Sequence, residues 1–153
     1  MPISHKTQTY LIILSRIILG GIFIYAAIGK IIDPYTFAVD IRNYQLIPDG
    51  YSNFLALALP WLELICGLLL ISGVWEKSAG ILISAMVIVF IFGISSAMIR
   101  GLDINCGCYK TAADSGEVGW SRLFEDLMFL LMGMVIIFKE KFFIYIDRIF
   151  KRI

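Results

Sequence analysis

The chain has 153 residues, of which 59% are hydrophobic and only 16% are charged. A soluble domain of this length has about 45–50% apolar and about 25% charged residues, so the composition excludes an ordinary soluble domain and indicates a membrane protein. The net charge of +1 gives no basic excess, and the sequence shows no nucleic-acid-binding motif, so we expect no nucleic-acid partner. The single histidine, His5, and three cysteines fall short of the usual ligands of a structural zinc, so we predict no metal site.

Four apolar runs are candidates for membrane-spanning helices, each of which needs about 20 residues to cross the hydrocarbon core. They cover residues 11–29, 54–73, 79–99 and 123–138, and the last is short, with two acidic residues in its opening turn. We therefore predict an all-α fold, an integral membrane bundle of four transmembrane helices that forms a single domain over residues 1–153.

A short amphipathic helix is predicted between the first two spans. Asp33-Pro34 is typical of a helix N-cap followed by proline at the first helical position. Phe37, Ile41 and Tyr44 then recur at helical spacing, and Asp40 is expected on the opposite face. Such a helix would lie at the outer interface of the membrane and end before Pro48.

The distribution of lysine and arginine favours one orientation of the bundle, because cytoplasmic flanks carry the excess of these residues. With both termini inside, eight of the 13 basic residues lie on the inner side of the membrane and five on the outer side. The tail after residue 138 alternates basic and apolar residues and is expected to be an amphipathic anchor on the inner surface. The loop over residues 100–122 then faces the outside, an oxidising compartment in which disulfides persist.

Cys106-Gly107-Cys108 lies in this outer loop and is the strongest candidate site in the sequence. Two cysteines so close together can form only a small, strained disulfide ring, and labile disulfides are the regulatory or catalytic ones. Closing so short a loop contributes little stability. We therefore favour a catalytic redox pair over a structural staple, and the sequence leaves open which cysteine attacks first.

Two charges inside the predicted spans form a second candidate site. Glu63 lies near the middle of the second span, where an unpaired carboxylate would cost several kcal/mol, and Arg16 in the first span is its expected partner. At about 1.5 Å per residue, Arg16 lies roughly 9 Å and Glu63 roughly 15 Å from the inner end of its span. The pair either fixes the register of the two helices or serves as a proton relay or a polar contact to a quinone head group.

Other small residues in the spans are assigned to packing. Cys66 lies one turn beyond Glu63 and is expected to be an apolar core residue outside the redox pair. Gly20, Gly21, Gly80 and Ser84 are expected to allow close approach of the helices.

In their order and spacing, these motifs resemble the MauE family of methylamine-utilisation proteins, within the wider DoxX-like group. The motifs that carry the resemblance are Arg16 with Leu19-Gly20, Lys30-Ile31-Ile32-Asp33-Pro34 with Phe37, Tyr44 with Pro48, Leu59-Pro60-Trp61-Leu62-Glu63 with Gly67, and Gly101 to Cys108. The family usually continues Cys-Gly-Cys with Phe-Gly, where this chain has Tyr109-Lys110.

The resemblance implies a four-helix protein of the bacterial cytoplasmic membrane that takes part in thiol–disulfide chemistry or in the maturation of exported proteins, such as a disulfide-rich methylamine dehydrogenase subunit. Its partners would be the lipid membrane and an exported protein or a thioredoxin-like redox protein. More distant DoxX-like proteins pass electrons from sulfur compounds to quinone, so the resemblance makes quinone the candidate cofactor. Fold membership does not fix the substrate.

Three classes of function stay open at this point. The first is a membrane thiol–disulfide oxidoreductase, in which Cys106 or Cys108 forms a mixed disulfide with a partner. The second is a non-catalytic assembly subunit, in which the cysteine pair only shapes the loop. The third is a small carrier with Glu63 in a polar pathway, and the lack of internal repeats in the sequence argues against it.

Overall fold

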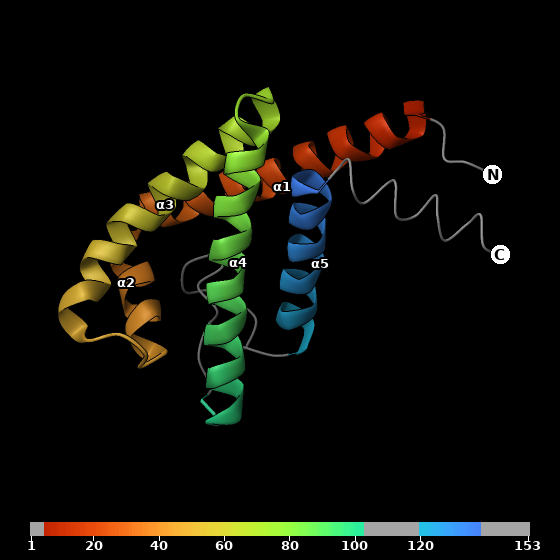
Figure 1. Ribbon diagram of the computed structural model, residues 1–153. Coiled ribbons are helices and arrows are strands. Elements are labelled where there is room, and N and C mark those ends of the chain that lie inside the picture. The colour runs from red at the N-terminus through yellow and green to blue at the C-terminus, as the bar shows by residue number, and fades with distance from the viewer. Residues whose placement is uncertain (1–4, 103–119, 139–153) are drawn as a thin grey trace.

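The structure, a computed structural model, describes residues 5–102 and 120–138, and every regular element in this part of the chain is an α-helix. The helices are α1 (His5–Ile32), α2 (Pro34–Asn43), α3 (Asp49–Ser72), α4 (Glu76–Ile99) and α5 (Trp120–Ile137). Figure 1 shows α4 and α5 side by side, with α1 passing behind them, α3 rising on the left toward the upper end of α4, and α2 beside the lower part of α3. The predicted all-α fold is confirmed.

Three helices are long and apolar enough to cross a membrane: 24 residues of α1 from Thr9, 23 of α3 from Gly50, and the 24 residues of α4. These confirm the first three predicted spans, and the chain is a multi-pass membrane protein. The fourth predicted span also folds as a helix, but α5 has only 18 residues and carries three ionisable side chains in its first two turns. Among the described helices, α5 therefore does not qualify as a span by length and composition.

The predicted N-cap of the short helix α2 is confirmed. The Asp33 carboxylate accepts a hydrogen bond from the backbone N–H of Thr36 at 3.1 Å and another from the Thr36 hydroxyl at 2.7 Å. These two hydrogen bonds hold the pKa of Asp33 below its usual value. Pro34 occupies the first turn, as predicted, and the helix ends at Asn43, ahead of Pro48.

The predicted polar face of α2 is wrong in one respect. Asp40 is buried, with 4% of its surface exposed, on the same side as Phe37, which is 2% exposed. The reason is the helical period of 3.6 residues, which places positions i, i+3 and i+4 on one face, so Asp40 lies beside Phe37 and Ile41. The apolar face of α2 thus carries a carboxyl group into the protein.

Glycines bring α1 and α3 into backbone contact. A Cβ atom at Gly20 would lie 2.9 Å from the carbonyl oxygen of Gly67, and a Cβ at Gly67 would lie 2.9 Å from the carbonyl oxygen of Gly20. Neither position can therefore hold a larger residue without moving the helices apart. Around the crossing lies the main core, which includes Cys66, 2% exposed, as predicted.

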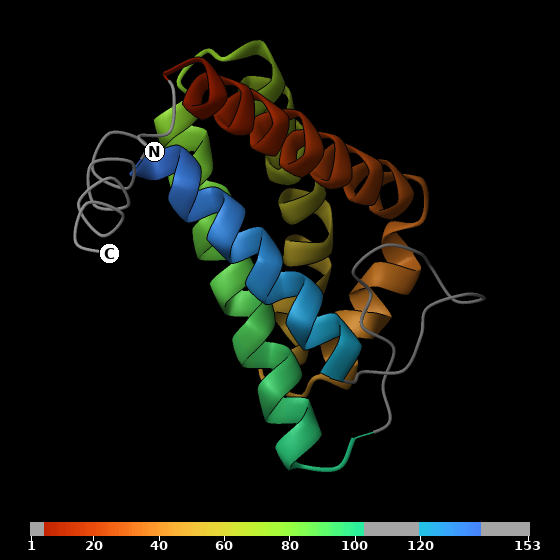
Figure 2. The same cartoon turned by 90° about the vertical axis from the view of Figure 1, so that its right-hand side faces the viewer.

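A second close approach joins α4 to α5, which lie next to each other along most of α5 in the view of Figure 2. A Cβ at Gly133 of α5 would collide with the hydroxyl of Ser84, and a Cβ at Gly80 would meet Ile136 at 3.4 Å. The predicted packing role is thus confirmed for Gly20, Gly80 and Ser84. It is wrong for Gly21, since a Cβ there would meet nothing within 4 Å.

Candidate functional site

A buried ion pair joins α1 to α3. Lys30, in the last turn of α1, donates from Nζ to Glu63 Oε1 at 2.7 Å and to Oε2 at 2.9 Å. The two side chains are only 4% and 1% exposed. Lys30 Nζ also lies 4.9 Å from the centre of the Phe37 ring and 5.2 Å from that of Phe90, so aromatic faces add to the stabilisation of the ammonium group.

The predicted pairing of Arg16 with Glu63 is therefore wrong. Side chains of an α-helix lean toward the N-terminus of their own helix. In the antiparallel pair α1 and α3, this lean carries Arg16 away from Glu63, whereas it brings Lys30 and Glu63 toward each other. A membrane depth counted along the helix from Cα positions does not include this lean. For side chains as long as those of arginine, lysine and glutamate, the lean decides which charged groups can meet.

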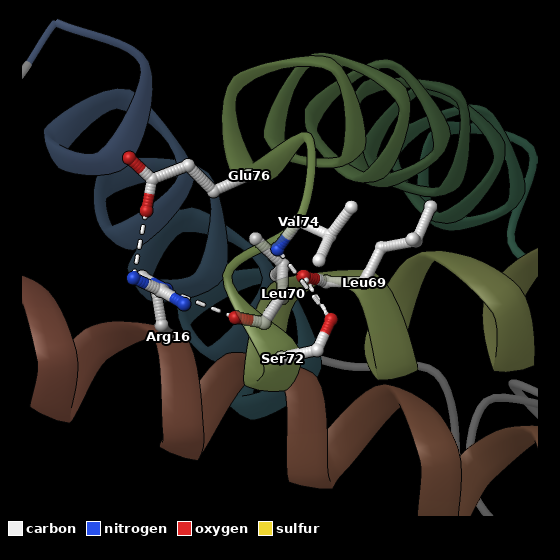
Figure 3. Close-up of polar contacts among 6 residues, drawn as sticks. All are labelled: Arg16, Leu69, Leu70, Ser72, Val74 and Glu76. Carbon is white, nitrogen blue, oxygen red and sulfur yellow. Dashed lines mark hydrogen bonds and ion pairs between the residues drawn. The ribbon is translucent and has the colours of Figure 1, made fainter.

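Arg16 instead secures the connection between α3 and α4, as Figure 3 shows. Its Nε donates to the carbonyl oxygen of Leu70 at 2.9 Å, and its Nη1 lies 2.7 Å from Glu76 Oε2. Gly73 ends α3 in a left-handed conformation with φ of 79°, which glycine adopts without strain. The Arg16 and Glu76 side chains are 17% and 18% exposed, as in a structural contact near the surface.

A second carboxyl group approaches the Lys30–Glu63 pair from α5. Asp126 is 8% exposed, the charges of Glu125, Arg122 and Lys30 all act on it, and its Oδ2 has no hydrogen-bond partner among the described residues. A small cavity of about 30 Å³ lies between these groups. Its lining is Ile22, Phe23, Ala26, Lys30, Glu63, Val87, Phe90, Asp126 and Phe129.

A larger and more apolar pocket of about 100 Å³ lies between α2, α3 and α4. Its lining is Phe37, Asp40, Ile41, Tyr44, Leu46, Ile47, Leu55, Leu59, Val89, Phe90 and Gly93. Asp40 Oδ2 is buried and has no hydrogen-bond partner in the described part of the chain. Burial, with a smaller contribution from the charge of Asp33, raises the pKa of Asp40 to about 6. Burial also raises the pKa of Tyr44.

The chemistry of the larger pocket fits a quinone head group. Such a ring needs apolar and aromatic walls and one or two polar groups that can exchange hydrogen bonds with its oxygens. Phe37 and Phe90 supply aromatic walls, and Asp40 and Tyr44 supply a carboxyl and a phenol. No group of three or more potential metal ligands occurs among the described residues.

Both cavities lie at the end of the bundle from which residues 103–119 depart. Lys30 is in the last turn of α1, Arg100 caps the C-terminus of α4, and Asp126 is in the second turn of α5. Arg100 Nη2 donates to the carbonyl oxygen of Tyr44, which ties the end of α4 to the end of α2. Cys106 and Cys108 lie outside the described residues, so their assignment as a redox pair stays a prediction.

The sequence reasoning missed Lys30, Asp40 and Asp126. Lys30 lies just after the first apolar run, and Asp126 lies in the opening turn of the fourth, so neither stands out in the sequence as an interior charge. Two of the three, Asp40 and Lys30, could have been found from the sequence. Asp40 shares a helical face with Phe37, and Lys30 is a basic residue at the end of the first span whose lean is toward the interior.

Comparison with known proteins places the chain among the relatives that its motifs suggested. The family model described as methylamine utilisation protein MauE matches residues 8–139. The methylamine utilization protein MauE of Paracoccus denitrificans is 27% identical over 122 residues, which cover 79% of this chain and 65% of that protein. The protein of the same description from Methylophilus methylotrophus is 29% identical over 112 residues, 72% of this chain and 59% of that protein.

A third relative, the methylamine utilization protein MauE of Paracoccus versutus, is 27% identical over 120 residues, which cover 78% of this chain and 64% of that protein. The matched part of the chain thus spans between 59% and 65% of the length of these curated relatives. No solved structure matches the chain.

Proposed function

The chain belongs to the MauE family of methylamine utilisation proteins, and from that premise we propose that it is a membrane thiol–disulfide protein that helps an exported protein to mature. The observation that carries the proposal is the Cys106-Gly107-Cys108 sequence in the segment between α4 and α5. That segment joins the bundle at the end where Lys30, Asp40 and Asp126 lie buried.

The anchoring of this segment supports the proposal. The carbonyl oxygen of Ala97 accepts from the N–H of Leu102 at 3.0 Å, and that of Met98 accepts from the N–H of Gly101 at 3.1 Å. This is a Schellman motif, with Gly101 at φ of 65°, and it ends α4 sharply. Cys106 therefore follows, four positions later in the sequence, Leu102, whose backbone is hydrogen-bonded to the end of α4.

The reaction that we propose is disulfide exchange. A thiolate of the exported protein attacks one sulfur of the Cys106–Cys108 disulfide, which breaks the S–S bond and forms a mixed disulfide with the partner. A second thiolate of the exported protein then attacks the exported protein's sulfur in the mixed disulfide. This forms the new disulfide within the exported protein and releases Cys106 and Cys108 as a dithiol. Two electrons have then passed from the exported protein to the pair.

A quinone would reoxidise the pair, since a quinone takes up two electrons and two protons to give a quinol. The residues that would hold its ring are the aromatic walls of the larger pocket, and Asp40 and Tyr44 would exchange hydrogen bonds with its oxygens. Burial holds the pKa of Asp40 at about 6, close enough to neutrality for this carboxyl to carry a proton to the ring.

The test is to trap the redox state of the cysteines in intact membranes with a thiol-alkylating reagent. We expect Cys106 and Cys108 to become reduced when an exported dithiol substrate is expressed, and the single serine variants to accumulate mixed disulfides. Cys66→Ser is the matched control, because Cys66 is buried in the core and should affect neither result. A pair that stays permanently oxidised, together with a fully active double serine variant, would refute the proposal and favour a non-catalytic assembly subunit.

A further inference from the structure

The charges around the small cavity do not balance. Glu63 and Asp126 together carry two negative charges when ionised, and Lys30 carries one positive charge. All three line the cavity, and they are between 1% and 8% exposed. An uncompensated charge in such a place costs several kcal/mol, so the group of three needs one more positive charge.

The groups packed around this cluster do not supply that charge. Tyr44, at the end of α2, lies close enough to feel the charges of Asp40 and Asp126, and both of these are acidic. The helix α4 presents Val87 and Phe90 to the cavity, which are apolar. On α5 itself, Arg122 and Glu125 both act on Asp126 with opposite signs, and Arg122 Nη1 lies 2.9 Å from Glu125 Oε2, so these two charges offset each other. The described surroundings therefore leave the cluster one positive charge short.

The cavity has room and partners for water. Its volume of about 30 Å³ exceeds the roughly 10–15 Å³ that one water molecule requires. The Lys30 ammonium, the Glu63 carboxylate and the unpartnered Asp126 Oδ2 offer the two to four hydrogen bonds that such a water makes. A water molecule in the cavity can therefore bridge the two carboxyl groups and pass a proton from one to the other.

We propose that Lys30, Glu63 and Asp126 form a proton-binding site inside the bundle that holds one proton, shared between the two carboxyl groups. With this proton bound, the site carries one ammonium, one carboxylate and one carboxylic acid, and its net charge is zero. Release of the proton leaves one carboxylate uncompensated, and the Lys30 ammonium then lies between two acceptors. The inference rests on the charges and the cavity, independently of any thiol chemistry.

Charge balance gives a specific pattern for variants. Asp126→Asn leaves Lys30 and Glu63 as a neutral pair, so that variant should hold no proton. Glu63→Gln leaves Lys30 and Asp126 as a neutral pair and should also hold none. Lys30→Met leaves two carboxyl groups without a cation and should hold two protons. If Asp126 were protonated only because it is desolvated, Glu63→Gln would leave its proton in place, so this variant separates the two explanations.

The measurement is infrared spectroscopy of the purified full-length protein in lipid nanodiscs, following the carbonyl stretch of protonated carboxylic acids. It is made at about pH 8, where Asp40, with a pKa raised to about 6, is ionised. We expect a band of one carboxylic acid per chain in the wild type, loss of that band in Asp126→Asn and Glu63→Gln, and a twofold band in Lys30→Met. Glu76→Gln is the matched control and should leave the wild-type band unchanged, since Glu76 pairs with Arg16 at the other end of the bundle and does not line the cavity.

Three results would overturn the proposal. One is a wild-type protein without the band, and another is a band that survives in Glu63→Gln. The third is a band that disappears when potassium or ammonium chloride is added at constant pH, because a small cation would then be the ligand. If Lys30→Met does not fold, the wild type and the two acid variants still decide the question.

Discussion

The two ends of the α1–α3 helix pair differ in the burial and the pairing of their charged side chains. At one end, Arg16 bonds to Glu76 and to the Leu70 carbonyl, and the ion-paired side chains keep 17% and 18% of their surface exposed. At the other end, Lys30 and Glu63 are buried to 4% and 1% exposure, beside further acidic groups whose oxygens lack partners among the described residues. Partly exposed ion pairs are typical of structural contacts, whereas buried and unbalanced charge is typical of functional sites.

The largest difference between the two ends should come from Lys30→Met. Without Lys30, Glu63 must take up a proton in the folded protein or stay charged without compensation, and either costs free energy, so we expect the variant to lose about 3–5 kcal/mol of stability at neutral pH. Thermal denaturation in detergent measures this loss. It should shrink at low pH, where Glu63 is protonated in the unfolded chain as well, and the double variant Lys30→Met/Glu63→Leu should recover much of it. Equal stability of the single variant and the wild type would contradict the comparison.

The variant Asp40→Asn tests the same end of the bundle through the pH dependence of its stability. The carboxyl of Asp40 ionises at about pH 4 in the unfolded chain and, with its pKa raised, at about 6 in the folded one. The folded state therefore holds this proton more tightly, and stability falls as the pH rises from about 4 to about 6. We expect Asp40→Asn to remove this decline and to gain about 1–3 kcal/mol at pH 7. Denaturation curves at a series of pH values should show no difference between variant and wild type near pH 4.

Gly73→Ala tests the structural end. Gly73 has φ of 79°, and a Cβ atom there would collide with the guanidinium group of Arg16. The left-handed backbone costs a non-glycine residue about 1–2 kcal/mol, so we expect a loss of that size. The loss should be the same at all pH values between 5 and 8, because no titratable group is removed. A loss that varies with pH would show that this end also holds a proton.

Glu76→Gln should have the smallest effect of the four. The Arg16–Glu76 pair is partly exposed, and pairs of this kind contribute about 1 kcal/mol or less. Added salt should reduce the difference between variant and wild type, and Lys77→Gln, at the next position of α4, serves as the control for the removal of a neighbouring charge. A loss as large as that in Lys30→Met would remove the distinction between the two ends.

Much of the fold could be predicted because it depends on local or additive properties. Length and apolar content are sufficient for the three spans, and the cap of α2 follows from Asp33-Pro34 alone. The partner of Glu63 could not be found in this way, because it depends on which helix packs against α3, in which direction, and on the lean of long side chains. The Asp40 position, by contrast, was within reach of the sequence, since its helical spacing from Phe37 already places it on the buried face.

The Asp126 carboxyl shows a different limit. Its place in the site depends on α5 packing against α4 and α1, and nothing in residues 120–126 indicates that arrangement. The close approach of Gly133 to Ser84, about two helical turns beyond Asp126 on α5, is what sets the depth of α5 beside α4. The position of the acid is thus a result of packing at small residues further along the helix.

The glycine contacts between α1 and α3 have a mechanical consequence. Where two backbones touch at Gly20 and Gly67, no side chain can change rotamer to let the helices slide. On the other side of the bundle, a Cβ at Gly133 of α5 would meet the Ser84 hydroxyl of α4, so this pair also packs at small residues. The small cavity is lined by residues of both pairs, and it therefore lies on the seam between them. A displacement of one pair against the other would change its volume without separating the close contacts within either pair.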